Sequence, residues 1–180
     1  MKKLNIILKD EDLGLEATLF NDDAEMRYAA RGIVVDPKTN KIAISVKTKI
    51  HEYKLPGGGM EKDESPEDTF MREVFEETGC RVEILQKLGT VFEERSVINM
   101  KQESIIFVAE VIENTGELIL EKGEIDEGMH VEWMSVEEAI KMIDASFDVV
   151  KESKYESIHS KHFVLRRDKL ILEFYQLNNS

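Results

Sequence analysis

Residues 57–64 read GGGMEKDE and residues 72–80 read REVFEETGC, and together they decide the local fold of the segment that they enclose. Pro66 suits the first turn of a helix, because it has no N–H to lose there and its φ is already helical. Gly79 suits the position just after a helix, where the backbone often turns left-handed. The sequence therefore predicts a helix over residues 66–78 that is entered from a glycine-rich turn.

Three carboxylates lie on one face of this predicted helix. Glu73, Glu76 and Glu77 are spaced i, i+3 and i+4, so they project in the same direction. Neighbouring like charges cost roughly 0.2–0.5 kcal/mol per pair, and a purely structural helix would gain more from interleaved lysines. A solvated acidic face is the alternative, but clustered oxygen ligands favour a Mg²⁺ or Mn²⁺ site. We expect Glu76 and Glu77 to face solvent and the metal.

Two further features support a metal site. Consecutive glycines let the backbone approach a ligand closely, so a carbonyl of Gly57 or Gly58 can complete the coordination of the metal. Arg72 can pair with Glu64 and hold a carboxylate in position. This pairing would support the metal ligands without binding the metal itself. The sequence therefore supplies both the ligands and the residues that would support them.

These residues match the Nudix box, which is a glycine, five residues, a glutamate, seven residues, and then Arg-Glu-apolar-any-Glu-Glu-any-Gly-apolar. The chain thus resembles the Nudix hydrolases. The resemblance implies an α+β fold, an α/β/α sandwich with a mixed β-sheet between helices. It also implies metal-dependent hydrolysis of a nucleoside diphosphate linked to another group. The matching positions are Gly58, Glu64, Arg72, Glu73, Glu76, Glu77 and Gly79, with Val74 and Cys80 at the apolar positions.

The same resemblance suggests a role for each box residue. The general base would be Glu73 or a glutamate of the loop that follows, where Glu127 is our first choice and Glu121 and Glu124 are rivals. The alternative, that these three glutamates are simply solvated residues of a loop in an acidic protein, explains them about as well as a catalytic role does. The catalytic set that we expect is Glu64, Arg72, Glu73, Glu76 and Glu127, and the metal set is Gly57, Gly58, Glu73, Glu76 and Glu77.

Substrate contacts are harder to predict than the metal site. Arg27, Arg31 and Lys47 are candidates for binding substrate phosphates, although each alone is more often a surface charge. Phe92 is a candidate for stacking on a base, as is Trp133, although Trp133 would more often fill the core.

The substrate class is predicted only from absences. No proline follows Pro66, and the tyrosines after the box, Tyr155 and Tyr175, are distant from it. These absences favour a MutT-like nucleoside triphosphate pyrophosphatase over ADP-ribose and dinucleoside polyphosphate hydrolases. A hydrolase of ADP-ribose or nucleotide sugars is one alternative. A non-catalytic Nudix domain that binds a nucleotide metabolite is the other, but such domains usually lose box carboxylates, and this chain keeps them.

Composition excludes several classes of protein. The formal net charge is −13, from 37 acidic and 24 basic residues, which argues against nucleic acid as a partner. Cys80 is the only cysteine, so no internal disulfide can form, and a reducing, cytoplasmic setting is expected. No segment approaches the roughly 20 apolar residues of a membrane span.

Along the chain, short strands alternate with helices, and we expect a single domain over residues 1–180. Its core would span about 27–145, with an N-terminal strand and a C-terminal helix appended. The apolar surface of that last helix packs either on the domain or on a second subunit, as in a homodimer. We expect strands at 4–8, 28–35, 41–46, 82–93, 104–112, 117–120 and 131–134, a turn at 36–40, a polar loop at 121–130, and helices at 66–78, 135–143 and about 155–177.

Overall fold

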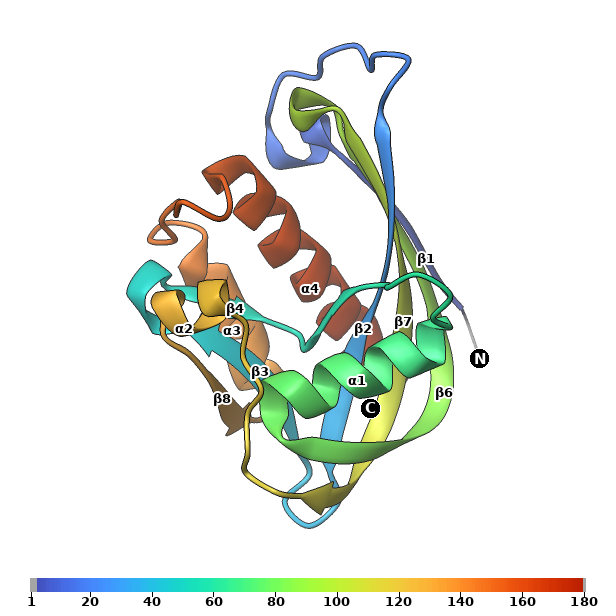
Figure 1. Cartoon of the computed structure of the whole chain (residues 1–180), viewed down its shortest axis with the longest axis vertical. Helices are drawn as coiled ribbons and strands as arrows, with labels where there is room; N and C mark the ends of the chain where they lie inside the picture. Colours follow the sequence, from blue (N-terminus) through green and yellow to red (C-terminus); the bar gives the residue numbers. More distant parts are fainter. Residues whose placement is uncertain (1–2, 180) are drawn as a thin grey trace.

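The computed structural model describes residues 3–179, which form an eight-stranded sheet flanked by helices (Figure 1). The strands are β1 (Leu4–Lys9), β2 (Glu25–Asp36), β3 (Lys41–Lys47), β4 (Glu52–Lys54), β5 (Gly57–Gly59), β6 (Cys80–Arg95), β7 (Met100–Asn114) and β8 (Met129–Met134). The α-helices are α1 (Pro66–Thr78), α2 (Lys122–Glu127), α3 (Val136–Ser146) and α4 (Ile158–Asn178), and short 3-10 helices cover Asp10–Leu13, Thr48–Ile50 and Ser96–Ile98.

The sheet is mixed and it divides between β2 and β3. The strand order is β1-β6-β7-β2-β3-β4, with β1 parallel to β6 and β2 parallel to β7. β2 and β3 pair only beside their connecting turn, at Val35 with Ile42 and at Asp36 with Lys41. Beyond that point β2 pairs with β5, while β3 pairs with β4 and β8. This division brings the glycine strand β5 to the end of α1.

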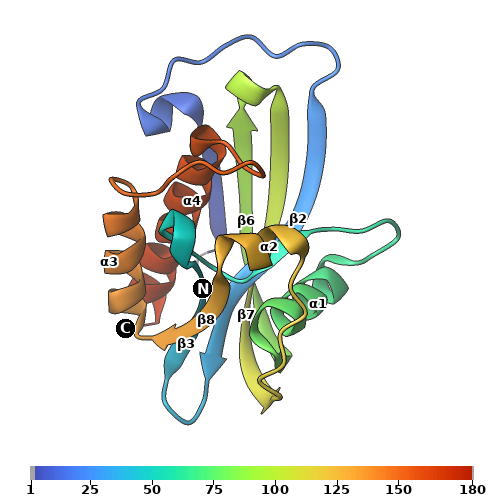
Figure 2. The ribbon, with the colours of Figure 1, turned by 60° about the vertical axis from the view of Figure 1, so that its left-hand side comes forward.

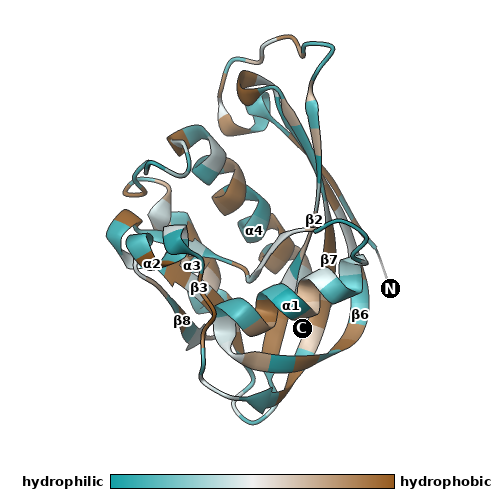
Figure 3. Cartoon of the chain, viewed as in Figure 1, coloured by the Kyte–Doolittle hydropathy of each residue, from teal (hydrophilic) through white to brown (hydrophobic). Residues whose placement is uncertain are grey.

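Helices cover both faces of the sheet, as Figures 1 and 2 show, so the expected α/β/α sandwich is confirmed. Helix α1 lies on one face, and α3 and α4 lie on the other (Figure 2). The α1 side has a core that contains Phe70, Val74 and Phe107, and the opposite side has a larger core that contains Ile33 and Leu165. Hydrophilic and hydrophobic residues both occur along β6 in Figure 3, in keeping with the alternation of buried and more exposed positions along this strand.

Helix α1 has the predicted bounds and the predicted end signals. Ser65 Oγ accepts a hydrogen bond from Asp68 N at 3.1 Å, which satisfies one of the free N–H groups of the first turn. Gly79 adopts a left-handed φ of 70°, and its N–H donates to Phe75 O at 2.8 Å. The ends of α1 therefore depend on local hydrogen bonds, which is why the sequence pattern predicts them.

Several predicted elements were wrong. Residues 117–120 form no strand, because their backbone bonds to the end of α1 instead, with Ile119 N donating to Glu76 O at 2.8 Å. The predicted loop 121–130 contains α2 and the first residues of β8. A capping box starts α2, in which Glu121 N donates to Glu124 Oε2 at 2.8 Å. The short strands β4 and β5 were not predicted, since they depend on pairing with β3 and β2.

Candidate active site

A cleft of about 350 Å³ lies between α1, β5 and the start of α2, and we call it the box cleft. It brings together the glycine strand, the carboxylates of α1 and two glutamates of the downstream segment. Residues far apart in the sequence therefore share one small cavity. Its lining residues are Arg27, Lys54, Gly57, Gly58, Gly59, Met60, Glu61, Arg72, Glu73, Glu76, Glu77, Glu121 and Glu124.

Arg72 connects the acidic residues of the box. Its Nε and Nη2 donate to the two carboxylate oxygens of Glu64 at 2.8 and 3.0 Å. Its Nη1 donates to Glu73 Oε1 at 2.9 Å and to Glu76 Oε2 at 3.1 Å, and its Nη2 reaches Gly59 O at 3.1 Å. The hydrogen bonds from Arg72 lower the pKa of Glu64 to about 2, so Glu64 remains ionised at neutral pH. Arg72 thus orients both helix carboxylates and ties them to β5.

Glu73 lies directly against the backbone of Gly58. A Cβ at Gly58 would lie 2.4 Å from the carboxylate carbon and from Oε1 of Glu73, so any larger residue would displace this side chain. Burial raises the pKa of Glu73, and the nearby charge of Glu77 adds to the effect. Glycine is therefore required here by the position of the carboxylate.

Glu77 is buried, which corrects our expectation that it faces solvent. Its side chain is only 2% exposed. Its Oε1 accepts from Lys54 Nζ at 2.8 Å, and its Oε2 accepts from Ser45 Oγ at 2.9 Å and from Gly57 N at 3.2 Å. These donors come from β3, β4 and β5, which converge at the end of α1. By contrast, the side chain of Glu76 is 33% exposed.

The donor set of the box cleft fits a divalent metal of the Mg²⁺ or Mn²⁺ type. Six of the lining side chains are glutamates, the neighbouring backbone is glycine, and the Glu73 carboxylate occupies the space that a Cβ would fill at Gly58. Among residues 3–179, no three acidic, histidine or cysteine side chains stand in the geometry of a formed metal site. Arg72 and Lys54 bond the carboxylate oxygens of Glu73, Glu76 and Glu77.

The downstream glutamates occupy different environments. Glu121 and Glu124 line the box cleft, and burial raises the pKa of Glu124. Glu127 does not line it, because its carboxylate is 4% exposed and pairs with Lys47 Nζ at 2.7 Å. Lys161 Nζ lies 3.8 Å from the same carboxylate. Our first choice for the general base is therefore placed outside the box cleft, and its rival Glu124 is placed inside.

A second cleft of about 670 Å³ adjoins the box cleft, and we call it the α4 cleft because the start of α4 forms one wall. The two clefts share Arg27, Glu121 and Glu124 as lining residues. The α4 cleft is lined by Arg27, Lys47, Arg95, Ile98, Met100, Glu121, Lys122, Gly123, Glu124, Glu127, Tyr155, Glu156, Ser157 and Ser160.

The predicted substrate contacts are divided among several places. Arg27 lines both clefts, and Lys47 lines the α4 cleft while it pairs with Glu127. Arg31 is buried between the sheet and α4, and burial lowers its pKa to about 10. Phe92 lines neither cleft, and its backbone lies in β6 between Ile7 of β1 and Glu103 of β7. The structure thus brings Arg27 and Lys47 to the clefts, but not Arg31 or Phe92.

Sequence reasoning missed Lys54 and Arg95. Lys54 directly precedes the Leu-Pro-Gly run, so its position beside the box was a signal that we did not use. Arg95 carried no such signal, because its cleft forms only when β6 and α4 meet.

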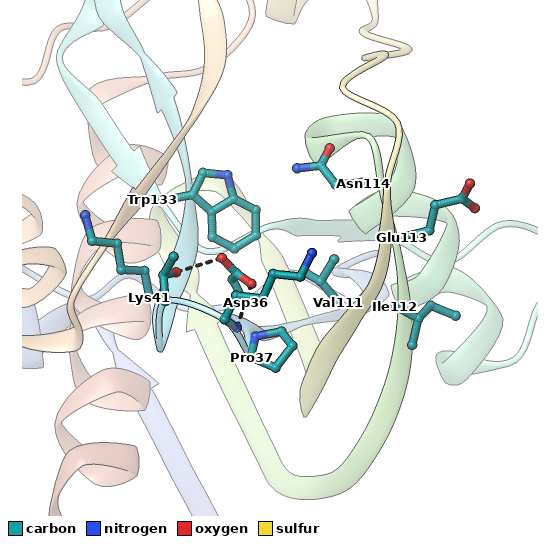
Figure 4. A pocket seen from close by; sticks show the side chains of 10 residues that line it. Asp36, Pro37, Lys41, Val111, Ile112, Glu113, Asn114 and Trp133 are labelled. Atoms are coloured by element: carbon teal, nitrogen blue, oxygen red, sulfur yellow. Dashed lines mark hydrogen bonds between the residues drawn. The ribbon is translucent and has the colours of Figure 1, made fainter.

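A third cavity, of about 460 Å³, lies at the turn between β2 and β3 (Figure 4). Trp133 forms part of its wall and also packs against the core on the α1 side. Asp36 closes the turn, accepting hydrogen bonds from Thr39 Oγ1 at 2.7 Å and Lys38 N at 3.0 Å. No box residue lines this cavity, so Trp133 is not placed to stack on a ligand in the box cleft.

We expect Gly58→Ala to lower turnover about 10- to 100-fold with little change in stability, because the new Cβ would push the carboxylate of Glu73 away. Steady-state kinetics and thermal melts would measure the two effects. Gly59→Ala is the matched control, since its Cβ would meet only Arg27 Nη2, at an ordinary 3.6 Å. Equal activities for the two variants would contradict this role for Gly58.

Comparison with known proteins shows the family of this chain. The family model described as NUDIX domain matches residues 26–153, which is most of the chain. The chain belongs to the NUDIX family. A solved structure described as a NUDIX hydrolase from Nitrosomonas europaea covers 86% of this NUDIX chain, and the match spans 90% of that protein, with a TM-score of 0.60 and 17% identity. That likeness shows a shared fold.

Curated relatives are similar over about half of their length. Mouse diphosphoinositol polyphosphate phosphohydrolase 3-alpha is 37% identical over 91 residues, which are 49% of this chain and 51% of the relative. Human diphosphoinositol polyphosphate phosphohydrolase 2 is 36% identical over 94 residues, 51% of this chain and 47% of the relative. Among the described residues of this NUDIX protein, no helix has the length and apolar character needed to cross a bilayer.

Proposed function

We propose that this NUDIX protein is a metal-dependent hydrolase that cleaves a phosphoanhydride bond in a small diphosphorylated molecule. The observation that carries this proposal is the box cleft itself. Its carboxylates lie in one cavity with the glycine backbone, and Arg72 holds Glu64, Glu73 and Glu76 in a single network. Such a cavity is suited to phosphate groups once a divalent cation offsets the negative charge.

Glu73, Glu76 and Glu77, with a carbonyl of Gly57 or Gly58, would hold Mg²⁺ or Mn²⁺. The metal would neutralise phosphate oxygens and lower the pKa of the attacking water. Water attacks one phosphorus, the anhydride P–O bond breaks, and the bridging oxygen leaves with the other phosphate. The water proton passes to a carboxylate that faces the cleft. Arg72 and Lys54 position the carboxylates throughout, because each donates to the helix glutamates.

We infer that Glu124 is the better candidate for the downstream general base. It lines the box cleft, whereas the Glu127 carboxylate is held by Lys47. Removing a general base typically lowers the rate about 10²- to 10⁴-fold. We therefore expect Glu124→Gln to lose turnover by that order and to keep its melting temperature.

Glu127→Gln should behave in the opposite way. It would remove the closest carboxylate from Lys47, at 2.7 Å, and one of the three carboxylates within 4 Å of the buried Lys161, so the melting temperature should fall while turnover changes less. Steady-state kinetics and thermal melts on both variants would separate these outcomes. If Glu127→Gln lost turnover and Glu124→Gln did not, the assignment would be reversed.

The substrate class is the finer part of the proposal. The names of the mouse and human relatives support a diphosphorylated inositol polyphosphate as the first substrate to test. The absence of subfamily residues after the box supports a nucleoside triphosphate as the second. ADP-ribose and nucleotide sugars complete the comparison.

A substrate panel would test the proposed function. The purified protein would be incubated with each compound and Mg²⁺ or Mn²⁺, and release of phosphate or pyrophosphate would be measured. We expect turnover of at least one compound that depends on added metal. Tight binding of one compound with no turnover of any would identify a non-catalytic binding domain and overturn the proposal.

A further inference from the structure

The α4 cleft extends the space of the box cleft toward the C-terminal helix. Arg27, Glu121 and Glu124 form the wall that the two clefts share, so a molecule held in the box cleft can reach into the α4 cleft. The far wall is formed by Ser157, which caps α4, and by Ser160 in its first turn. The α4 cleft is therefore placed to receive the part of a substrate that is not cleaved.

Arg95 is the buried cation of this cleft. It is 3% exposed, yet it lines the cavity. Its Nη2 donates to Glu93 Oε1 at 2.8 Å, and its guanidinium lies 5.1 Å from the centre of the Phe163 ring. Its Nε has no hydrogen-bond partner among residues 3–179. A buried donor without a partner costs free energy, so a ligand that accepts this hydrogen bond would be stabilised.

The buried arginines near Arg95 keep donors that the neighbouring carboxylates do not use. Glu93 accepts from Arg95 and lies 3.4 Å from Arg167 Nη1, while Arg167 Nε donates to Asp168 at 2.7 Å. Arg31 is the third buried arginine of this group, and its Nε also lacks a partner among the described residues. Burial lowers the pKa of Arg31, and the charge of Arg167 lowers it further. Nε of Arg95 and Nε of Arg31 thus remain buried donors without a partner among the described residues, and an anion that accepts from them would be favoured.

The glutamates that line only the α4 cleft are paired with buried lysines. Glu127 pairs with Lys47 at 2.7 Å, and Glu156 lies 3.6 Å from Lys161 Nζ, while the buried Glu52 lies within 4 Å of both lysines. Glu121 and Glu124 belong to the wall shared with the box cleft, where a bound metal would offset their charge.

The same cleft is poorly suited to a nucleobase. Tyr155 is the only aromatic residue in its described lining. Lys154 Nζ lies 4.8 Å from the centre of the Tyr155 ring, and a Cβ at Gly123 would lie 3.4 Å from the ring carbons. The Tyr155 hydroxyl is hydrogen-bonded to Asp126. Tyr155 is 46% exposed, but these contacts occupy part of its ring and its hydroxyl, so it offers a base less surface than a free aromatic side chain would.

We propose that the α4 cleft is a phosphate subsite, in which Arg95 and Arg27 bind a further phosphate group of the substrate beside the diphosphate that is cleaved. This inference rests on the proposed function for the identity of the substrate. The subsite favours substrates whose non-cleaved part carries phosphate over those in which it is an unphosphorylated nucleoside.

A binding experiment without metal tests the subsite independently of turnover. Inorganic phosphate would be titrated calorimetrically into the wild type and into Arg95→Gln, Arg27→Gln and Lys38→Gln. Lys38 is exposed at the β2–β3 turn, so its variant has the same charge change outside both clefts. We expect at least tenfold weaker binding for the Arg95 and Arg27 variants and no change for Lys38→Gln. If Arg95→Gln fails to fold by circular dichroism, Arg27→Gln carries the test.

A kinetic experiment then distinguishes a substrate phosphate from free phosphate. Two substrates would share the cleaved diphosphate, and one of them would carry an additional phosphate on its other part. We expect the additional phosphate to lower KM in the wild type, and this advantage to disappear in Arg95→Gln or Arg27→Gln. Equal KM values in the wild type would overturn the proposal, as would phosphate binding that is unchanged in both arginine variants. Failure of the proposed function would appear separately, as absence of turnover for every compound.

Discussion

Glu76→Gln should lose turnover by at least about a hundredfold, which corresponds to roughly 2.7 kcal/mol of transition-state stabilisation. Glu76 is the box carboxylate with the fewest structural contacts. Its side chain is 33% exposed, and Arg72 Nη1 at 3.1 Å is its only side-chain donor among the described residues. Replacing the carboxylate by an amide removes a metal ligand while keeping its shape, so the cost to stability should stay below about 1 kcal/mol.

Steady-state kinetics at saturating Mg²⁺ and a thermal melt would measure both quantities. Glu67→Gln is the control, because Glu67 lies in the exposed first turn of the same helix. We expect the control to keep nearly all of its turnover. Wild-type turnover by Glu76→Gln would remove this residue from the metal site. Glu77→Gln tests the metal site less directly, because Ser45, Lys54 and Gly57 all donate to the buried carboxylate. The substitution would therefore disturb these hydrogen bonds as well as the metal ligand.

Gly32→Ala should destabilise the protein by about 3 kcal/mol or more. Gly32 pairs with Phe107 where β2 and β7 run side by side at the centre of the sheet. A Cβ at this position would lie 2.0 Å from the carbonyl oxygen of Phe107 and 2.8 Å from its carbonyl carbon. Those atoms belong to a paired backbone, which cannot move aside as a flexible side chain can. The two strands would have to separate locally.

Urea unfolding followed by circular dichroism would measure the change in the free energy of unfolding. Gly59→Ala again serves as the comparison, since it is a strand glycine with room for a Cβ, and its cost should stay within about 1 kcal/mol. A Gly32→Ala protein as stable as the wild type would show that β2 and β7 are not packed as closely as described.

Much of the box was predictable from the sequence because its geometry is local. The spacing of Glu73, Glu76 and Glu77 places them near one another on any α-helix, and the end signals of that helix are adjacent in the chain. The pairing of Arg72 with Glu64 was also predictable, since the helix and the glycine turn are directly connected. The sandwich architecture followed from the resemblance that these residues carry.

Other parts of the site depend on contacts between distant segments. The burial of Glu77 requires Ser45 and Lys54, which reach it only after β3 and β4 have joined the sheet. The preference for Glu124 over Glu127 depends on Lys47 and on the short helix α2, which sequence pattern presents as a loop. Nothing in the spacing of three acidic residues shows which of them will face a cleft.

The sequence by itself determined the chemistry of the box, because a helix aligns its own carboxylates through hydrogen bonds between residues four apart. Only the tertiary structure decided which charges are available to a ligand. It buries Arg31 and Glu77, holds Glu127 in an ion pair, and places Arg95 beside the first turn of α4. The physical reason is that burial and pairing depend on which elements pack together, and distant residues such as Glu93 of β6 and Arg167 of α4 meet only in the folded protein.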